Sequence, residues 1–327
     1  MLEHIAHFSD ANHAGTDRDA DRTARMLEWT QYAGWPAVSM RDGALELLIV
    51  PSIGGRLMGI RHHGHELSFV NPSIAGRTPS DDPSEWAALC GAWSFPLWGG
   101  GKTWVAPESR WPDGAPHRDL DSGAYTVLKT WCDERAMGIE LESPVCSQSG
   151  LQIVRRITLE AGQSRWSTLH RLTNRGSIAC DCGIWEVLML NRPAQVGVRV
   201  DSSGLDLRDV VAQIAGKGPI EDLCASDIVR LNADVLSVAC DRAVEFKLGV
   251  AHATGALDVT WAGADGARVH RYTRTSDVVP GADYAHGTAI EVFNAPLLPY
   301  FEVETHAPLA RLKAEQSVEY EITESVR

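Results

Sequence analysis

Residues 244–250 read Val-Glu-Phe-Lys-Leu-Gly-Val, a stretch in which apolar residues alternate with other residues. A period of two places the apolar side chains on one face of a β-strand, so this stretch predicts a strand with one buried face. Similar runs follow along the chain, separated by Gly, Asn, Asp or Pro, as strands of an antiparallel sheet usually are. We predict strands over residues 45–50, 151–159, 166–173, 184–190, 300–306 and 319–322.

Helical patterns are scarce in this sequence. Residues 82–89 begin with Asp-Pro-Ser-Glu, which supplies an N-cap, a proline in the first turn and an acid at the third helical position. We predict a short helix there, and two others over residues 205–214 and 221–229. No strand–helix alternation recurs, which argues against a parallel α/β sheet. The sequence therefore predicts an all-β protein, with a polar arm over residues 1–28 and one large antiparallel β-sandwich over residues 29–327.

Composition excludes several classes of protein. The chain has 327 residues, 44% hydrophobic and 22% charged, which is typical of a globular protein rather than a disordered or fibrous one. Thirty Lys and Arg against 43 Asp and Glu give a net charge of −13, which disfavours nucleic acid and anionic membranes as partners. No run reaches the roughly 18 apolar residues of a membrane span, and the first residues lack the apolar core of a secretory signal. We therefore expect a cytoplasmic location.

Cysteine and histidine patterns give little support for a metal. The seven cysteines include no CxxC pair, so we interpret them as free thiols, mostly buried. His62, His63 and His65 lie close together in sequence on a predicted turn, where their side chains need not share a face. We favour a surface turn over a metal site there, and we expect no metal and no cofactor.

A glycine pair precedes Arg56. Gly54 and Gly55 permit positive φ or a close backbone approach, so the chain is expected to bend immediately before Arg56. One interpretation is a hairpin with a solvated arginine. The other directs the guanidinium into a pocket, where it would bind hydroxyls or a carboxylate.

Residues 98–108 read Trp-Gly-Gly-Gly-Lys-Thr-Trp-Val-Ala-Pro-Glu. Gly-Lys-Thr is typical of a phosphate-binding loop, but Pro96 stands where that motif needs its first glycine, and no long helix can follow. We therefore reject a phosphate loop. What remains is a glycine-rich bend that carries Lys102, Trp104 and Glu108.

Trp111 and His117 follow within the same long loop. Tryptophan rings stack on flat apolar faces such as those of sugars, and long loops rich in such residues are often functional. We predict that this segment forms a pocket wall in which Trp104 and Trp111 stack on a ligand. The alternative is a packed loop with a purely structural role.

Acidic residues stand on two predicted strands. In residues 300–306, Glu302, Glu304 and His306 would share one face, and two carboxylates with an imidazole can perform general acid–base catalysis. A solvated outer face is the alternative. Glu186 is the single acid in an apolar strand, where it must be paired or used in function.

Four segments together resemble galactose mutarotase-like proteins, and most of all the DUF4380-type branch of that superfamily. They are VPSIGGRLMGIRHHGHELSFVNP (residues 50–72), GGGKTWVAPESRWPDG (99–114), HRLTNRGSIACDCGIWEVLMLNRP (170–193) and EVFNAPLLPYFEVETHAPLARLKAEQSVEYEI (291–322). The resemblance extends over roughly residues 35–325.

The resemblance implies a β-supersandwich of two large sheets with a sugar-binding cleft on a concave face. In aldose epimerases of this superfamily a Glu takes the anomeric proton and a His donates a proton to the ring oxygen. The catalytic His of these epimerases and the Glu-containing motif near the end of their sequences have no clear match in this sequence. The residues that do match belong to the looser pattern of the DUF4380-type branch. These are Arg56, Lys102, Trp104, Glu108, Glu186, Glu302 and Glu304, and His117 and His306 are the candidate acids.

Three functions remain open at this point, because fold alone does not fix the reaction. We favour an aldose 1-epimerase-like isomerase that acts on a hexose or a modified sugar. A carbohydrate lyase would instead use Arg56 or Lys102 to neutralise a carboxylate and His117 as the base. A non-catalytic sugar-binding module is the third. All three require the tryptophan-rich segment and the acidic strand to line one sugar-sized hollow.

Overall fold

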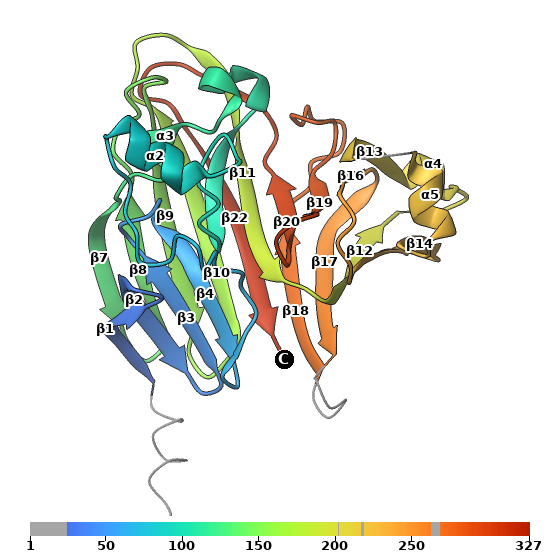
Figure 1. The fold of residues 1–327 in the computed structure, drawn as a ribbon, viewed down its shortest axis with the longest axis horizontal. Coiled ribbons are helices and arrows are strands. Elements are labelled where there is room, and N and C mark those ends of the chain that lie inside the picture. Colours follow the sequence, from blue (N-terminus) through green and yellow to red (C-terminus); the bar gives the residue numbers. More distant parts are fainter. Residues whose placement is uncertain (1–24, 202, 217–218, 263–268) are drawn as a thin grey trace, which may run out of the picture.

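The computed structural model describes residues 25–201, 203–216, 219–262 and 269–327. Within these residues two antiparallel β-sheets dominate the architecture (Figure 1). The larger sheet contains β1 (Met26–Tyr32), β2 (Trp35–Asp42), β3 (Leu45–Val50), β4 (Arg56–His62), β5 (His65–Glu66), β6 (Gly101–Ala106), β11 (Cys180–Asn191), β13 (Val211–Gly216), β16 (Phe246–Val250), β19 (Ile290–Asn294), β20 (Tyr300–His306) and β21 (Ala310–Leu312). The smaller sheet contains β7 (Thr126–Cys132), β8 (Ala136–Glu142), β9 (Leu151–Glu160), β10 (Arg165–Asn174), β12 (Ala194–Val200), β14 (Val229–Asn232), β15 (Val235–Cys240), β17 (Ala253–Ala262), β18 (Val269–Ser276) and β22 (Ser317–Val326). The predicted all-β class is confirmed.

The order of the larger sheet is β1-β2-β3-β4-β6-β11-β20-β19-β16-β13, with β5 paired to β4 and β21 paired to β11. Strand β20 pairs with β11 on one side and with β19 on the other, so it joins the two halves of this sheet. The order of the smaller sheet is β14-β15-β12-β17-β18-β22-β10-β9-β8-β7. Residues distant in sequence therefore lie side by side on the central strands.

The core lies between the two sheets. Alternate residues of each strand enter it, as Phe301 and Val303 of β20 do, together with Ile157 of β9 and Tyr272 of β18. The intervening residues of β20 point the other way, to the face of the larger sheet turned away from the smaller sheet. We call this face the outer face. Successive side chains of a strand in the larger sheet thus point alternately into the core and to the outer face.

Helices are short. The elements are α2 (Pro83–Cys90), α3 (Arg118–Asp121), α4 (Leu207–Val210), α5 (Ile220–Ala225) and two single 3₁₀ turns, Glu108–Arg110 and Pro112–Gly114. The helix predicted over residues 82–89 is confirmed, and the Asp82 carboxylate accepts hydrogen bonds from the backbone N–H groups of its first turn. None of the described helices is long and apolar enough to cross a membrane.

The helix predicted over residues 205–214 is mostly wrong. Helix α4 ends at Val210, and the chain continues as β13 because residues 211–216 hydrogen-bond to the edge of β16. The helix predicted over residues 221–229 ends at Ala225, and Val229 already begins β14. Pairing with a neighbouring strand outweighs the local helical preference in both segments.

The first strand begins inside the expected polar arm. Met26 starts β1, so residues 26–28 belong to the sheet, and residues 1–24 lie outside the described residues. The other predicted strands are confirmed within a few residues of their bounds, and β20 matches residues 300–306 at both ends.

Candidate functional site

Five adjacent strands of the larger sheet carry polar side chains on the outer face. The register places Lys102 of β6 opposite Val187 of β11, Val187 opposite Glu304 of β20, and Glu304 opposite Glu291 of β19. Residues of the same register row on adjacent strands lie about 5 Å apart, so this row crosses the middle of the sheet. The charged side chains of this face are thus brought together by strand pairing.

Glu304 lies at the centre of this row and is buried. Its Oε2 accepts hydrogen bonds from Trp185 Nε1 at 2.8 Å and from Lys247 Nζ at 3.0 Å. Lys247 Nζ also lies 2.9 Å from Oε2 of Glu291, so one ammonium group joins two carboxylates. Burial and the neighbouring carboxylates raise the pKa of Glu304 to about 8 against the opposing charge of Lys247. Glu304 therefore holds a proton more readily than an acid in water does.

Two histidines meet the other oxygen of Glu291. Nδ1 of His286 lies 2.7 Å from Oε1 of Glu291, and Nε2 of His306 lies 3.2 Å from the same oxygen. Burial favours the neutral acid, but the hydrogen bond with His286 and the surrounding positive groups lower the pKa of Glu291 well below its ordinary value. The same hydrogen bond raises the pKa of His286, whereas burial lowers that of His306.

We call Lys247, Glu291, Glu304, His286 and His306 the carboxylate–histidine cluster. Trp185 of β11 covers it. The Trp185 ring stacks on the His306 ring with centroids 5.0 Å apart and meets the His286 ring edge-on at 5.2 Å. The Lys247 ammonium lies 4.4 Å from the centroid of the same indole. The tryptophan fixes the orientation of every neighbouring ring and cation.

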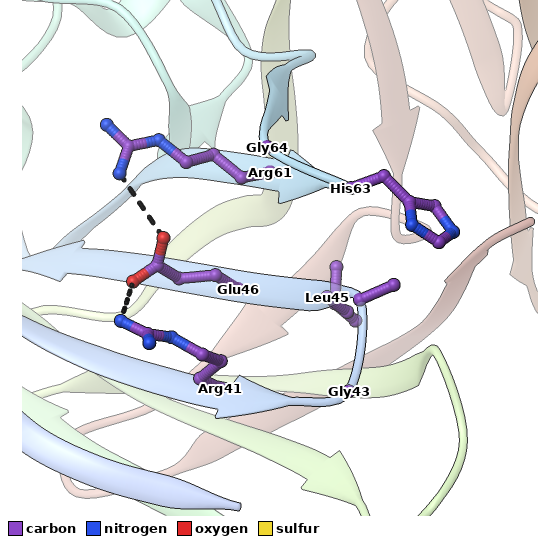
Figure 2. A pocket seen from close by; sticks show the side chains of 8 residues that line it. Arg41, Gly43, Leu45, Glu46, Arg61, His63 and Gly64 are labelled. Atoms are coloured by element: carbon purple, nitrogen blue, oxygen red, sulfur yellow. Dashed lines mark hydrogen bonds and ion pairs between the residues drawn. The ribbon is translucent and has the colours of Figure 1, made fainter. Parts of the chain in front are cut away.

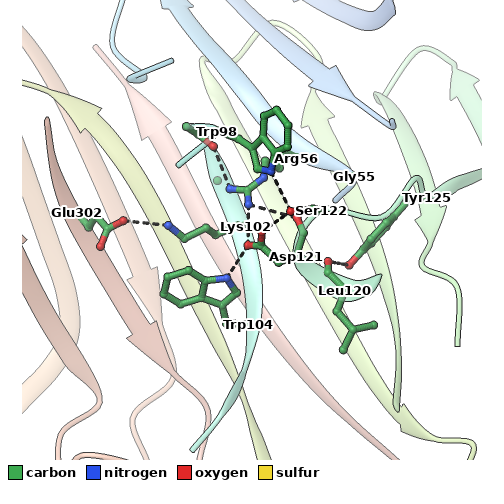
Figure 3. A network of polar contacts seen from close by, with 12 residues as sticks. Gly55, Arg56, Trp98, Lys102, Trp104, Leu120, Asp121, Ser122, Tyr125 and Glu302 are labelled. Atoms are coloured by element: carbon green, nitrogen blue, oxygen red, sulfur yellow. Dashed lines mark hydrogen bonds and ion pairs between the residues drawn. The ribbon is translucent and has the colours of Figure 1, made fainter. Parts of the chain in front are cut away.

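A second polar network lies on the outer face toward β4 (Figure 3). Lys102 Nζ donates to Glu302 Oε1 at 2.9 Å and lies 4.1 Å from the centroid of the Trp104 ring. Arg56 and Trp104 both donate to Oδ1 of Asp121, each at 2.7 Å. All of these side chains are buried. Arg56 is therefore neither the solvated arginine nor the pocket-lining arginine that the sequence left open, because Asp121 binds it in the interior.

Apolar side chains close the outer face above these networks. Phe95, Trp111, Ala285 and Leu309 pack against Trp104 and Trp185. The Trp111 ring stacks on the Trp185 ring with centroids 5.5 Å apart, and Trp111 Nε1 donates to Val105 O at 2.7 Å. Glu304 is consequently only 1% exposed, while the side chains of His286 and Lys247 are 12% and 13% exposed. These two residues are the least buried members of the cluster.

The structure thus brings together most of the predicted site residues. The predicted residues on the outer face are Arg56, Lys102, Trp104, Trp111, Glu302, Glu304 and His306. Glu108 lies at its rim, exposed on a 3₁₀ turn, where its charge helps to raise the pKa of His286.

Two predicted residues lie elsewhere. Glu186 points between the sheets, where it pairs with Arg274 of β18, so the core ion pair is the correct interpretation. His117 lines a cavity of about 210 Å³ with Cys180 and Cys182, and it lies beside the thiol of Cys146. No contact joins either residue to the carboxylate–histidine cluster among the interactions of the described residues. His286 and His306 both contact the ring of Trp185, whose Nε1 donates to Glu304.

The expected sugar-sized hollow is filled by side chains. Lys102, Glu302, Glu304 and His306 line none of the five cavities that we find on the described surface. One cavity of about 360 Å³ lies beside the β2–β3 hairpin, where Glu46 binds Arg41 and Arg61, each at 3.2 Å (Figure 2). Glu46 is paired with both arginines, and His63 is the other titratable side chain of the lining.

A different cavity adjoins the cluster. It measures about 560 Å³ and is lined by the ends of β16 and β17 and by residues 278–282, 284 and 287–289. Thr288 is part of its wall, and Thr288 Oγ1 also lies 3.5 Å from Oε1 of Glu291. Among the five cavities it is the one whose lining flanks His286 in sequence.

The histidine-rich turn is confirmed as a turn between β4 and β5. His62 Nδ1 lies 3.1 Å from Nδ1 of His270, and the ring of His65 stacks on that of His270 with centroids 4.7 Å apart. His270 belongs to β18, so this turn contacts the smaller sheet. We call His62, His63, His65 and His270 the turn histidines.

Sequence reasoning missed Lys247, His286 and Glu291. Glu291 carries the same signal as Glu186, a single acid between the apolar residues Ile290 and Val292, and could have been found by it. Lys247 stands on the polar side of the alternating stretch that predicted β16. His286 lies in a loop without periodicity, and no sequence signal points to it.

Comparisons with known proteins support the fold. No family model matches the chain, and no curated protein matches it in sequence. Among solved structures, a galactose mutarotase-like protein from Clostridium acetobutylicum is similar over 93% of this chain and 98% of its own, with 12% identity and a TM-score of 0.56. A galactose mutarotase-like protein from Lactobacillus casei is similar over 89% of this chain and 100% of its own, with 10% identity and a TM-score of 0.53.

A candidate aldose 1-epimerase from Escherichia coli is also similar, over 93% of this chain and 99% of its own, with 11% identity and a TM-score of 0.52. Sequence identities this low support a shared fold but do not show which residues of the proteins correspond. The two large antiparallel sheets, together with these similarities, show that the chain has a galactose mutarotase-like fold.

Proposed function

We propose that the protein is a carbohydrate-active isomerase of the aldose 1-epimerase type, with the carboxylate–histidine cluster as its acid–base centre. The observation that carries the proposal is the pairing of Glu304 and His286 around one tryptophan on the outer face of a galactose mutarotase-like fold. Membership of the DUF4380-type branch and a cytoplasmic location are further parts of this proposal.

The reaction needs two proton transfers. Ring opening of a hemiacetal removes the proton from the anomeric hydroxyl, breaks the bond between C1 and the ring oxygen, and protonates that oxygen. In our proposal Glu304 takes the first proton and His286 donates the second. Rotation about the C1–C2 bond then presents the other face of the carbonyl, and the same two residues run the steps in reverse.

The electrostatics of the cluster suit this exchange. Burial and the neighbouring carboxylates raise the pKa of Glu304 to about 8, and the hydrogen bond with Glu291 raises the pKa of His286 above its ordinary value. Nδ1 of His286 is engaged by Glu291, which leaves Nε2 to face a sugar oxygen. A general base and a general acid matched to the working pH accelerate such reactions by about 10²–10⁴-fold.

The charges of the outer face favour a neutral sugar. Arg56 is paired with Asp121, Lys102 with Glu302, and Lys247 with two carboxylates. The lyase alternative requires Arg56 or Lys102 to bind a substrate carboxylate, and both already bind a protein carboxylate. Because Glu304 is covered, the proposal also requires the side chains over Trp185 to move apart when a sugar binds.

Mutarotation followed by polarimetry tests the proposal. The change in optical rotation of freshly dissolved α-D-glucose and α-D-galactose is measured against a blank without protein, because buffers also catalyse this reaction. We expect catalysis by the wild-type protein, and a loss of about 10²–10⁴-fold in Glu304→Gln and in His286→Ala. Glu319→Gln is the matched control, since Glu319 is exposed on the smaller sheet and pairs with Arg171.

Three results would overturn the assignment. Full turnover by folded Glu304→Gln and His286→Ala would remove these residues from the mechanism. Absence of catalysis over a panel of monosaccharides, with heat of binding in calorimetry, would show a sugar-binding module instead. A rise in ultraviolet absorbance with uronate-containing polymers would show a lyase.

A further inference from the structure

We infer that His286, Glu291 and His306 form a binding site for a first-row transition-metal dication of the zinc class. The inference goes beyond the proposed function, and its test does not need turnover. Each residue contributes one ligand atom, and these three atoms lie within 4.8 Å of one another. Two imidazoles and one carboxylate are a ligand set that zinc uses in proteins, with water in the fourth position.

The distances are close to those of a bound ion. Zinc bonds of about 2.0–2.1 Å in tetrahedral geometry place neighbouring ligand atoms about 3.3 Å apart. Nε2 of His306 lies 3.2 Å from Oε1 of Glu291, and Nδ1 of His286 lies 2.7 Å from it. The second separation would widen by about half an ångström, and the two imidazole nitrogens, which lie within 4.8 Å of each other, would take up a similar spacing. Rotation of the partly exposed His286 side chain can supply that change.

The hydrogen bonding of His306 supports the inference. The residue is fully buried; its Nδ1 has no hydrogen-bond partner among the described residues, and its Nε2 faces only Oε1 of Glu291, at 3.2 Å. A buried polar atom without a partner costs about 1–3 kcal/mol. Stacking against Trp185 holds the ring in a position from which Nε2 points toward Glu291. A metal ion would satisfy Nε2 without any movement of the ring.

The surroundings resemble the outer shell of a metal site. Lys247 binds Oε2 of Glu291, while the two imidazoles face Oε1, so the ammonium and the ion would contact opposite oxygens of one carboxylate. With neutral imidazoles and both acids ionised, Lys247, Glu291 and Glu304 sum to a charge of −1, which offsets part of the charge of a dication; while Glu304 holds its proton the sum is zero. Outer-shell hydrogen bonds of this kind orient the ligands.

The site also has an approach route. Thr288 lies against Glu291 and lines the cavity of about 560 Å³ that adjoins this part of the chain. With an ion on Nδ1, His286 would be a neutral imidazole that keeps its proton on Nε2, so it would not donate that proton to a sugar oxygen near neutral pH. Metal binding and the proposed proton donation by His286 are therefore alternative states of the cluster.

Calorimetric titration of the full-length protein with Zn²⁺ tests the site, after dialysis against a chelator and its removal. We expect saturable binding of one ion by the wild-type protein at neutral pH, with a rise in melting temperature. Glu291→Gln and His306→Ala should each weaken binding by at least about 100-fold, since even outer-shell changes cost 10–100-fold. His65→Ala is the matched control, because the turn histidines are the other place on the described surface where imidazoles gather.

Folding of each variant is checked by circular dichroism. If His306→Ala does not fold, Glu291→Gln, which keeps the shape of the side chain, and the more exposed His286→Ala carry the test. Loss of Zn²⁺ binding in His65→Ala with retention in Glu291→Gln would overturn the inference and assign the ion to the turn histidines. Absence of saturable binding by the wild-type protein would overturn it as well, and would leave the mutarotation assay unaffected.

Discussion

Replacement of Glu304 by Gln should stabilise the protein in alkaline solution. Because the folded-state pKa of Glu304 is raised above its ordinary value of 4.5 to about 8, the folded state binds this proton more tightly than the unfolded state does. Its contribution to stability is therefore complete below about pH 4.5 and is lost as the pH rises through about 8. At about 1.4 kcal/mol per pH unit, the shift corresponds to about 5 kcal/mol at most.

The expected effect is smaller than this limit. Glu304 and Glu291 share Lys247 and titrate as a coupled pair, so part of the shift of one acid is compensated by the other. We expect the wild-type free energy of unfolding to fall by about 2–4 kcal/mol between about pH 5 and pH 9, relative to Glu304→Gln. The neutral amide leaves Lys247 paired with Glu291 alone and does not titrate.

Urea unfolding at a series of pH values, followed by tryptophan fluorescence, measures this difference. The protein is first treated with a chelator, so that metal binding at Glu291 does not contribute. Glu319→Gln serves as the exposed control and should run parallel to the wild type. Parallel curves for the wild type and Glu304→Gln would show that Glu304 titrates normally, and would refute the electrostatic description of the cluster.

Two further predictions concern the scaffold. Arg274→Met should lower the free energy of unfolding by about 3–5 kcal/mol, because it leaves Glu186 and Glu324 buried between the sheets without their cation. Arg311→Met, which removes an exposed ion pair, should lower it by about 1 kcal/mol or less in the same urea titrations. A cost for Arg274→Met as small as that of Arg311→Met would contradict this account. Gly99→Ala should lower the melting temperature by several degrees, because φ of Gly99 is +112° and a Cβ there would lie 2.2 Å from a backbone oxygen. An unchanged melting temperature would show that the loop relaxes freely.

The fold was predictable because apolar and polar residues alternate locally along its strands. Strand β20 shows this well: its period of two separates Phe301 and Val303 from Glu302 and Glu304, and the structure keeps that division. The helix predicted over residues 205–214 failed where a neighbouring strand edge competed for the backbone. Such competition depends on residues far away in sequence, and a local pattern cannot contain it.

The candidate site was predictable only in part for the same reason. Glu186 and Glu304 are both acids on predicted strands, but one enters the core and the other the outer face. Their partners, Arg274 and Lys247, lie 88 and 57 residues away. Residue type indicated that both acids need a cation, but only strand order determines which cation each acid meets. His286 lies in a loop, and the sequence of this loop has no periodicity from which its path could be predicted.

The position of β20 also constrains when this molecule can finish folding. Its residues stand near the C-terminus, yet they pair with β11 and β19 in the middle of the larger sheet. During synthesis the earlier strand β11 must wait with one edge unpaired until residues 300–306 leave the ribosome. A chain that terminates before residue 300 would keep that edge open and lose Glu302, Glu304 and His306 together. Premature termination should therefore yield an aggregation-prone protein rather than a smaller active one.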